Sequence, residues 1–367
     1  MNAARGRPRT ALLHAFDWRE VRRGTERLLE ELATGLAGDG YPVTVISAHR
    51  GGRAIEDRGG VRVVLNRRPP SFGLARRHAL AHVPASRRSL AAGGFDLAHA
   101  FHPADALAAV RWSRAGGGPA LFTVPAFPPE RSGPLRRRWL DAVFAGAAVV
   151  VPTGAVAEAV SAAFPAARIE AIPPGVDTGR FTPGPGRATA PIALCAADLR
   201  EPRKQVPMLA RAFSAVRRAI PEARLVLANP YPGAPPAWAR GEGIEVRPVG
   251  SDADLLAAYR EAWVSVLPAR AEPFGLVLAE SMACGTPVLG AADGGIPEVV
   301  GEGAQGRVVP AAGEAREEAW AEALTRALSS PPAETAAVAA RERGEHFSMR
   351  RCLEAYEDLY ARLLAAG

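Results

Sequence analysis

Short apolar runs alternate with amphipathic stretches along this chain of 367 residues, and the alternation occurs twice. In the first half, the runs Thr10–Phe16, Tyr41–Ser47 and Ala147–Val151 are separated by segments long enough to be helices. The pattern restarts after residues 182–186, which read Thr-Pro-Gly-Pro-Gly and are typical of a linker. Strands that alternate with helices predict a parallel sheet with helices on both faces. We therefore expect an α/β protein made of two doubly wound domains.

The same pattern predicts the individual elements. In the first half it adds a helix at Gly24–Leu36 and strands at Val61–Leu65, Phe95–Pro103 and Ala120–Val124. In the second half it predicts strands at Ile192–Ala196, Arg224–Ala228, Ile244–Val249, Val264–Leu267 and Val288–Leu289, and helices at Gln205–Ile220, Leu255–Glu261 and His346–Leu364. We expect a first domain over residues 1–182, a second over 183–345, and a C-terminal helix within 346–367.

The composition describes a globular protein. Hydrophobic residues make up 48% of the chain and charged residues 23%, which excludes a disordered chain. The cysteines Cys195, Cys284 and Cys352 are isolated, so neither a disulfide framework nor a zinc motif is expected, which favours a cytoplasmic location. The longest apolar stretch, residues 142–157, contains Pro152 and is too short to cross a bilayer.

Charge is distributed unevenly. Residues 1–182 carry 25 arginines and no lysine against 15 acids, a net charge of +10, whereas residues 183–367 carry −3. A basic surface attracts anionic lipid headgroups or phosphorylated acceptors. Nucleic acid is not expected as a partner, because no aromatic-interleaved or zinc-finger pattern accompanies the arginines. Arginines spread over solvated faces are an equally open interpretation. The clusters are Arg67-Arg68, Arg76-Arg77, Arg87-Arg88 and Arg136–Arg138.

Two glutamates, Glu272 and Glu280, flank the predicted start of a helix. Pro273 suits the first turn, where its missing N–H would have no partner. The N–H groups of residues 274–276 would then form an anion site that the helix dipole strengthens. At about 100° per residue, the two glutamates would not share a helix face. This layout fits a nucleotide sugar, with a phosphate in the middle and hydroxyls at both ends, better than a paired-carboxylate acid/base site.

The motif reads Glu-Pro-Phe-Gly-Leu, then Glu-Ser-Met-Ala-Cys-Gly-Thr-Pro-Val and Gly-Gly-Ile-Pro-Glu. It closely resembles the E-x7-E signature of retaining, GT-B-fold glycosyltransferases of family 4, the group 1 type. The resemblance implies that Glu272 contacts the donor sugar, that Phe274, Gly275 and Leu276 hold the diphosphate, and that Glu280 binds the ribose. The alternative is a buried helix with one solvated and one capping glutamate.

The resemblance also implies an architecture. GT-B proteins have two Rossmann-like α/β/α domains that face each other across a cleft. The first domain would bind the acceptor and the second the nucleotide sugar, with the last helix crossing back onto the first domain.

Lys204 is the only lysine of the chain, and it follows the first strand of the second half. The family places G-R-L…K-G there, and its arginine and lysine clamp the donor diphosphate. An ammonium at this position would neutralise charge on the leaving diphosphate; a solvated turn residue is the alternative. The segment also departs from the pattern, because Asp198 replaces the clamp arginine and Gln205 the glycine. Arg200 or Arg203 could supply the missing charge, with Asp198 directed elsewhere.

Glycines mark two further loops. Arg23-Gly24-Thr25 resembles the loop of the first domain that approaches the diphosphate and the acceptor, and Thr25 could cap the following helix. An ordinary turn with a cap is as consistent with these residues. Gly294 and Gly295 would bring the backbone close to the donor sugar, as in relatives.

Histidines are candidates on the acceptor side. His99 and His102 follow a strand where family members carry histidines, and an imidazole suits a general base. Structural histidines are common, and a structural role is the alternative for both. His14, at the end of the first strand, also faces the expected cleft. The family's T-x-H histidine would fall at Pro125, which cannot act as a base.

No metal is expected. The D-x-D at Asp252-Ala-Asp254 precedes an amphipathic segment, so it is interpreted as a helix N-cap beginning at Ser251. No cofactor motif is present, and the nucleoside diphosphate sugar would serve as the donor substrate.

These features predict a retaining hexosyltransferase that moves a sugar from a nucleoside diphosphate to a small-molecule or lipid-linked acceptor. It would be cytoplasmic, with peripheral contact to an anionic membrane through the basic first domain. A natural-product tailoring enzyme with an unusual donor or acceptor is one alternative. A non-catalytic relative that binds a nucleotide or sugar is another, and donor hydrolysis would separate it from the enzymes.

Overall fold

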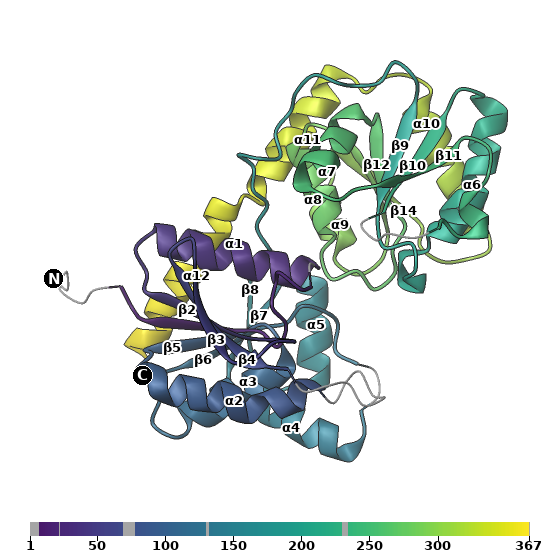
Figure 1. Cartoon of the computed structure of the whole chain (residues 1–367). Helices are drawn as coiled ribbons and strands as arrows, with labels where there is room; N and C mark the ends of the chain where they lie inside the picture. The colour runs from purple at the N-terminus through teal and green to yellow at the C-terminus, as the bar shows by residue number, and fades with distance from the viewer. Residues whose placement is uncertain (1–6, 22, 69–77, 130–131, 230–233, 367) are drawn as a thin grey trace. The chain divides into compact units, whose positions relative to one another are not determined.

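The computed structural model describes residues 7–21, 23–68, 78–129, 132–229 and 234–366, and these form two compact units (Figure 1). Unit 1 comprises residues 1–173 and 350–367, and unit 2 comprises residues 174–349. The Pro/Gly-rich segment 182–186 therefore lies inside unit 2, past the point at which the chain leaves unit 1. The final residues belong to unit 1.

Unit 1 is built on an eight-stranded sheet with the order β3-β4-β2-β1-β5-β6-β7-β8, in which only β3 is antiparallel to its neighbour. Its strands are β1 (Thr10–Leu13), β2 (Val43–His49), β3 (Ala54–Arg58), β4 (Val61–Arg67), β5 (Leu97–Ala100), β6 (Ala120–Thr123), β7 (Ala148–Val151) and β8 (Arg168–Ala171). Strands β1, β5, β6 and β7 are buried along their whole length, as is usual in a parallel sheet that is covered on both faces.

Helices cover both faces of this sheet (Figure 1). They are α1 (Gly24–Gly38), α2 (His78–Gly93), α3 (Pro103–Ser113), α4 (Pro134–Gly146), α5 (Gly154–Ala163) and the returning C-terminal helix α12 (Met349–Ala365). Helix α12 packs closely on α1, because a Cβ added at Gly35 would lie 2.5 Å from a methyl group of Leu353.

Unit 2 contains a six-stranded, all-parallel sheet with the order β11-β10-β9-β12-β13-β14. Its strands are β9 (Ile192–Ala196), β10 (Arg224–Asn229), β11 (Ile244–Pro248), β12 (Val264–Leu267), β13 (Val288–Ala291) and β14 (Gly306–Val309). Its helices are α6 (Val206–Ala219), α7 (Asp252–Glu261), α8 (Leu276–Ala283), α9 (Ile296–Val300), α10 (Arg316–Leu328) and α11 (Glu334–His346). The expectation of two doubly wound α/β units is confirmed.

Some boundaries differ from those expected. Strand β1 ends at Leu13, because the backbone N–H of Phe16 donates to the His14 ring at 3.1 Å and turns the chain. Strand β3 was not expected; it pairs with β4 through Gly59 and Gly60, which both have positive φ. The last helix begins at Met349 instead of residue 346.

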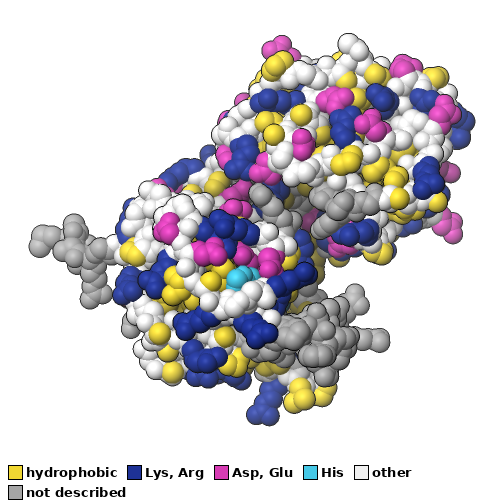
Figure 2. All heavy atoms as spheres, viewed as in Figure 1, with side chains coloured by type: hydrophobic (Ala, Val, Ile, Leu, Met, Phe, Trp, Pro, Cys, Tyr) yellow, Lys and Arg dark blue, Asp and Glu magenta, His cyan; other side chains and the backbone are white. Residues whose placement is uncertain are grey.

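Each sheet has one point at which the strand order reverses direction. In unit 1 it lies between β1 and β5, and in unit 2 between β9 and β12. In doubly wound sheets, ligands bind at the carboxyl ends of the strands that flank this point. Figure 2 shows basic and acidic side chains interspersed over unit 2, whereas basic side chains predominate on the part of unit 1 where α2 and α4 lie.

Candidate functional site

The carboxyl ends of β9 and β12 bring the single lysine of unit 2 beside the first glutamate of the motif. Lys204 Nζ donates a hydrogen bond to Glu272 Oε2 at 2.7 Å, and Arg203 Nη1 donates to the same oxygen at 2.7 Å. The two loops are also joined through the backbone, since Arg270 N–H donates to the Arg203 carbonyl oxygen at 2.8 Å. We call Arg203, Lys204 and Glu272 the Glu272 cluster.

The Glu272 cluster holds an ionised carboxylate in a confined place. Glu272 is only 9% exposed. Burial by itself would raise the pKa of its carboxyl, but the charges of Lys204 and Arg203 outweigh burial and lower that pKa below its ordinary value. Lys204 has three donors and Arg203 has five. Arg203 Nε also donates to Glu201 Oε1 at 2.9 Å, so the two cations are matched by two carboxylates. The remaining N–H donors of Lys204 and Arg203 suit a phosphate, and the Glu272 carboxylate is an acceptor that suits sugar hydroxyls.

The backbone around Glu272 is constrained by the Gly-Gly turn. A Cβ at Gly294, which has φ +61°, would lie 2.3 Å from the Glu272 carbonyl oxygen, so only glycine fits there. Gly295 N–H donates to that same oxygen at 2.8 Å. Ala271 adopts φ +45°, and its N–H donates to Asp293 Oδ1 at 2.9 Å. Non-glycine residues at positive φ cluster at functional sites. The turn therefore fixes the position of the Glu272 carboxylate.

The helix of the motif begins later than expected. Helix α8 starts at Leu276, after Gly275 in the left-handed region at φ +95°, so the prediction that Pro273 occupies its first turn is wrong. The first N–H groups of α8, those of Leu276 and Val277, precede any intrahelical acceptor. Phe274 packs edge-on against Phe347 with ring centroids 5.2 Å apart, which anchors the turn in the core of unit 2.

Glu280 lies inside α8 and is only 1% exposed. Tyr259 Oη, from α7, donates to its Oε2 at 2.9 Å. Tyr259 itself is held in place because Thr286 Oγ1 donates to its carbonyl oxygen at 2.7 Å. Tyr259 is not among the residues predicted from the sequence, because no local pattern connects it to the motif.

The two departures from the family's pattern in the loop after β9, at Asp198 and Gln205, have local structural explanations. Asp198 accepts from the backbone N–H and from Nε of Arg200, both at 3.0 Å, so each compensates the charge of the other. Burial raises and Arg200 lowers the pKa of Asp198, and the net result is a lowered pKa. Gln205 lies at φ +54°, the conformation that glycine adopts most readily, at the position where the resembling family has glycine. Of the two arginines considered for the missing charge, Arg203 joins the Glu272 cluster and Arg200 pairs with Asp198.

A second polar group lies at the carboxyl ends of β1 and β5 in unit 1. The rings of His14 and His102 meet edge to face with centroids 6.2 Å apart, and His14 Nε2 lies 3.8 Å from Glu26 Oε1. Burial lowers the pKa of both histidines to about 3, with further contributions from neighbouring charges. Both imidazoles are therefore uncharged at neutral pH. His102 Nδ1 also accepts from the Ala104 N–H at 3.2 Å and caps α3.

Helix α1 begins at Gly24, but its cap differs from the one expected. Arg23 occupies the N-cap, and its backbone N–H and guanidinium donate to the buried Glu26 carboxylate at 3.2 and 2.6 Å. The prediction that Thr25 caps this helix is therefore wrong. No described atom lies within 4 Å of a Cβ built on Gly24, so local packing does not require glycine there.

The interpretation of His99 as an acceptor-side base is also wrong. His99 is fully buried, with Nδ1 2.7 Å from Tyr360 Oη and Nε2 2.7 Å from Thr123 Oγ1. Thr123 Oγ1 lies 2.9 Å from Tyr356 Oη. Both ring nitrogens are thus used to attach α12 to β5 and β6. Residues 353–360 lie too far along the chain for this network to be recognised in the sequence.

The predicted N-cap at Ser251 is confirmed. Asp254 N–H donates to Ser251 Oγ at 3.2 Å, and the Asp254 carboxylate accepts from the Ser251 N–H at 3.0 Å, which completes a capping box. Within the described residues, no group of three or more His, Cys, Asp or Glu side chains could hold a metal ion. No described helix is long and apolar enough to cross a bilayer.

Comparisons with known proteins agree with this architecture. A family model described as "Glycosyltransferase Family 4" matches residues 22–180, and one described as "Glycosyl transferases group 1" matches residues 190–330. The chain belongs to the group 1, family 4 glycosyltransferases. Its fold is therefore GT-B, as the motif predicted.

Named relatives share part of this chain. A D-inositol 3-phosphate glycosyltransferase from Saccharomonospora viridis is 34% identical over 230 residues, which is 54% of this chain and 51% of that protein. A GDP-mannose-dependent α-(1-6)-phosphatidylinositol monomannoside mannosyltransferase from Mycolicibacterium smegmatis is 36% identical over 172 residues, 41% of this chain and 45% of the relative. The chain thus spans about half the length of the curated relatives it matches.

Solved structures extend the similarity of fold to nearly the whole chain. A sucrose-phosphate synthase from Thermosynechococcus elongatus superposes with a TM-score of 0.83, covering 98% of this chain and 100% of the other at 24% identity. At this identity the likeness concerns the fold alone.

Proposed function

We propose that this glycosyltransferase moves a sugar from a nucleoside diphosphate sugar to a small-molecule or lipid-linked acceptor, with retention of configuration at the anomeric carbon. The observation that carries the proposal is the Glu272 cluster, in which Lys204 and Arg203 donate to the same carboxylate oxygen at the switch point of unit 2. Unit 2 would bind the nucleotide sugar and unit 1 the acceptor. The family membership of the relatives supports the same reaction class.

Each member of the cluster has a distinct role in the proposed reaction. Glu272 would accept hydrogen bonds from donor sugar hydroxyls, and Gly294 and Gly295 would hold it in place. Lys204 and Arg203 would bind the diphosphate and stabilise the charge that develops on it as the bond to the anomeric carbon breaks. Removing one such donor typically lowers kcat by about 10²–10³.

The rest of the donor would lie along α8. The first N–H groups of that helix, after Phe274 and Gly275, would bind the diphosphate at Leu276. Glu280, which Tyr259 holds in place, would accept a hydrogen bond from the ribose. No metal ion is needed in this scheme, because Lys204, Arg203 and the helix supply the positive charge.

The chemistry balances without a cofactor. The bond between the anomeric carbon and the diphosphate oxygen breaks, and a bond to the acceptor oxygen forms on the same face of the sugar. The acceptor proton passes to the departing diphosphate oxygen. His102 and His14, both uncharged at neutral pH, would orient the acceptor hydroxyl from the carboxyl edge of the unit 1 sheet.

A peripheral membrane contact belongs to the same proposal. Leu135 of α4 is 83% exposed beside Arg136 and Arg138, an arrangement that suits an anionic membrane surface and a lipid-linked acceptor. Arg137 is engaged by Asp141 at 2.8 Å. The basic pair at residues 76–77 lies outside the described residues. Cosedimentation with phosphatidylglycerol vesicles that weakens in the variant L135S/R136Q/R138Q would support the contact, and unchanged binding or none at all would contradict it.

The decisive experiment measures stabilisation by nucleotides. A ligand present at about a hundred times its Kd adds roughly 2.7 kcal/mol to the free energy of unfolding. We expect one of UDP, GDP, ADP and dTDP to raise the melting temperature of the wild type and to do so much less in Glu280→Gln. Glu318→Gln, which changes an exposed carboxylate of α10, serves as the matched control and should behave as wild type.

Hydrolysis of the matching nucleotide sugar then separates an enzyme from a binding protein. Slow release of the nucleotide by the wild type, reduced about 10²-fold or more in Lys204→Met, is the expected result. Stabilisation without any hydrolysis or transfer would favour the non-catalytic alternative. Absence of stabilisation by every nucleotide would refute the donor site.

A further inference from the structure

A pocket in unit 1 lies beside α2, over strands β2, β4 and β3 at one end of the strand order. It has a volume of about 390 Å³. Its lining includes Arg9, Phe95 and the first residues of β2, which lie at the amino ends of the parallel strands. The lining then extends along β3 to Arg53, which lies beside the carboxyl end of β4. His14 and His102 follow β1 and β5, whereas the pocket lies over β2, β4 and β3.

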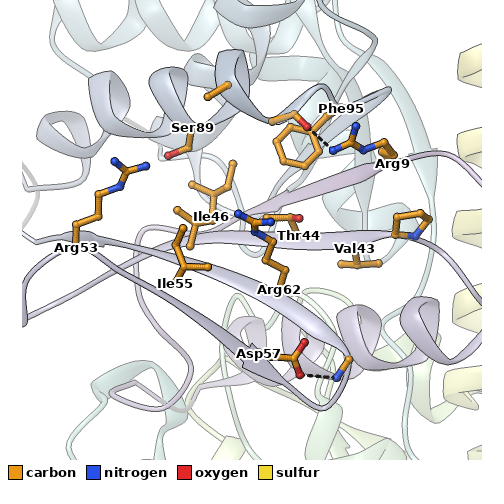
Figure 3. Close-up of a pocket in the computed structure, with 15 residues that line it drawn as sticks. Arg9, Val43, Thr44, Ile46, Arg53, Ile55, Asp57, Arg62, Ser89 and Phe95 are labelled. Carbon is orange, nitrogen blue, oxygen red and sulfur yellow. Dashed lines mark hydrogen bonds between the residues drawn. The ribbon is translucent and has the colours of Figure 1, made fainter.

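Three arginines line this pocket. Figure 3 shows Arg53 and Arg62 extending into it, with Arg9 at its far rim. Arg9 Nη2 donates to the Gly93 carbonyl oxygen at 2.8 Å, so this side chain is fixed. Among the described residues, Arg53 and Arg62 have no hydrogen-bond or ion-pair partner, which contrasts with the many paired arginines elsewhere in the chain. Two guanidinium groups therefore face the pocket with their donors available.

The nearest acid in the lining does not neutralise them. Asp57 of β3 is the direct cross-strand partner of Arg62 on β4. Its Oδ1 instead accepts from the Gly60 N–H at 3.1 Å, within the hairpin turn (Figure 3). No ion pair joins Asp57 to Arg62 within the described residues. With three arginines against one carboxylate, the lining carries a net positive charge.

The remainder of the lining is apolar. Ile46 and Val64 are buried and form the floor, while Ile55 is 55% exposed at the side. Phe95 closes the far end, and Ser89 of α2 adds a hydroxyl group. Pockets for small molecules typically combine an apolar lining with a few convergent polar groups, in volumes of roughly 300–1,000 Å³. An exposed isoleucine beside two unpaired arginines is consistent with such a site.

We propose that this pocket binds a phosphate monoester, with the phosphate between Arg53 and Arg62 and the organic body against Ile55 and Phe95. Paired guanidinium groups match the geometry of phosphate oxygens, and a dianion uses both charges. The shared chemistry is the phosphate monoester, whether on a soluble metabolite or on a lipid headgroup. The site is separate from the donor and acceptor sites, and it does not depend on the proposed function.

The test locates phosphate binding by hydrogen–deuterium exchange on the full chain. Inorganic phosphate is the probe, at about 10 mM, roughly tenfold above a millimolar Kd. We expect slower exchange in residues 54–67 and in the C-terminal half of α2. In R53Q/R62Q the apparent Kd for phosphate, taken from the concentration dependence of this protection, should rise about tenfold or more. The reason is that two charge-assisted hydrogen-bonding groups are lost.

Matched variants make the result specific. R87Q/R88Q removes the same charge from the exposed surface of α2 and should keep the protection. All of these arginines are on the surface, so urea unfolding should give the same midpoint for each variant as for wild type. No protection in the wild type, or equal loss in R53Q/R62Q and R87Q/R88Q, overturns the proposal.

The source of the phosphate is distinguished in two further samples. One contains glycerol 3-phosphate, and the other contains vesicles of phosphatidic acid in phosphatidylcholine. Protection by the soluble ester alone assigns the pocket to a metabolite, and protection by the vesicles alone assigns it to a lipid headgroup. Protection by neither, while inorganic phosphate protects, contradicts the part of the proposal that places an organic body on Ile55 and Phe95.

Discussion

Acid should unfold unit 1 before unit 2, because unit 1 holds four histidines in their uncharged form. Burial lowers the pKa of His14 and His102 to about 3 and that of His82 to about 4, and it lowers the pKa of His99 well below its ordinary value. In the unfolded chain these side chains titrate near pH 6.5. Since each folded pKa is below the unfolded one, the stabilisation is complete above about pH 6.5 and is lost as the pH falls below it.

The size of the effect follows from these shifts. At about pH 5, a histidine that stays neutral in the folded state is protonated in the unfolded chain. This difference lowers the free energy of unfolding by about 2 kcal/mol for each such histidine. His82 lies 3.5 Å from Asp105, whose pKa burial raises to about 7. The folded state therefore binds a proton on Asp105 more tightly than the unfolded chain does, which stabilises the folded state at about pH 5 by about 2 kcal/mol. This gain offsets the loss of stability caused by His82. His14, His99 and His102 together remove about 6 kcal/mol, comparable with the roughly 5–15 kcal/mol that stabilises a typical protein.

Hydrogen exchange between about pH 7.5 and about pH 5, corrected for the intrinsic exchange rate, measures the two units separately. Strands β1 and β5 should lose protection well before β9 and β12, since the one histidine of unit 2, His346, is exposed. His102→Asn should reduce the loss by about a third, because asparagine is a favoured N-cap and α3 would keep its start. His49→Asn, on β2, is the control. Equal losses in both units, or a flat profile for unit 1, would refute the reasoning.

Three further predictions concern Glu272 and the backbone that holds it. The effects of Lys204→Met and Glu272→Gln on the free energy of unfolding should not be additive. In urea unfolding, the double variant should lose about 1–3 kcal/mol less than the sum of the losses in the two single variants. Additive losses would mean that the ion pair contributes nothing to stability. Gly294→Ala should destabilise unit 2 by about 2 kcal/mol or more and remove stabilisation by nucleotides, since it combines a positive φ with a clash at a carbonyl oxygen. Gly313→Ala, at φ +97° with open space around it, should cost only about 1 kcal/mol, and equal costs would exclude the clash as the cause. Ala271→Gly should stabilise unit 2 by about 1 kcal/mol by relieving its positive φ, and an unchanged unfolding midpoint would show that this backbone is not strained.

Local sequence signals explain which elements could be predicted. Strands β9 and β12 were predicted with the bounds they have, because continuous apolar runs mark strands buried on both faces. The polar strand β3 was not, although its Gly59-Gly60 turn is a recognised hairpin signal that could have identified it. The start of α8 was misplaced because Pro273 permits a helix start without requiring one, and the left-handed Gly275 delays it.

The sequence by itself determined the two-unit α/β architecture, the helix N-cap at Ser251 and the motif that identifies the family. All three depend on residues close together in the chain, so periodicity, capping chemistry and spacing suffice. Only the tertiary structure decided which distant polar side chains meet. Lys204 and Glu272 are 68 residues apart, and His99 meets Tyr360 across 261 residues. Such pairs are fixed by the order of strands in each sheet and by the return of α12 to unit 1, and contacts between segments so distant in sequence have no local pattern that could predict them.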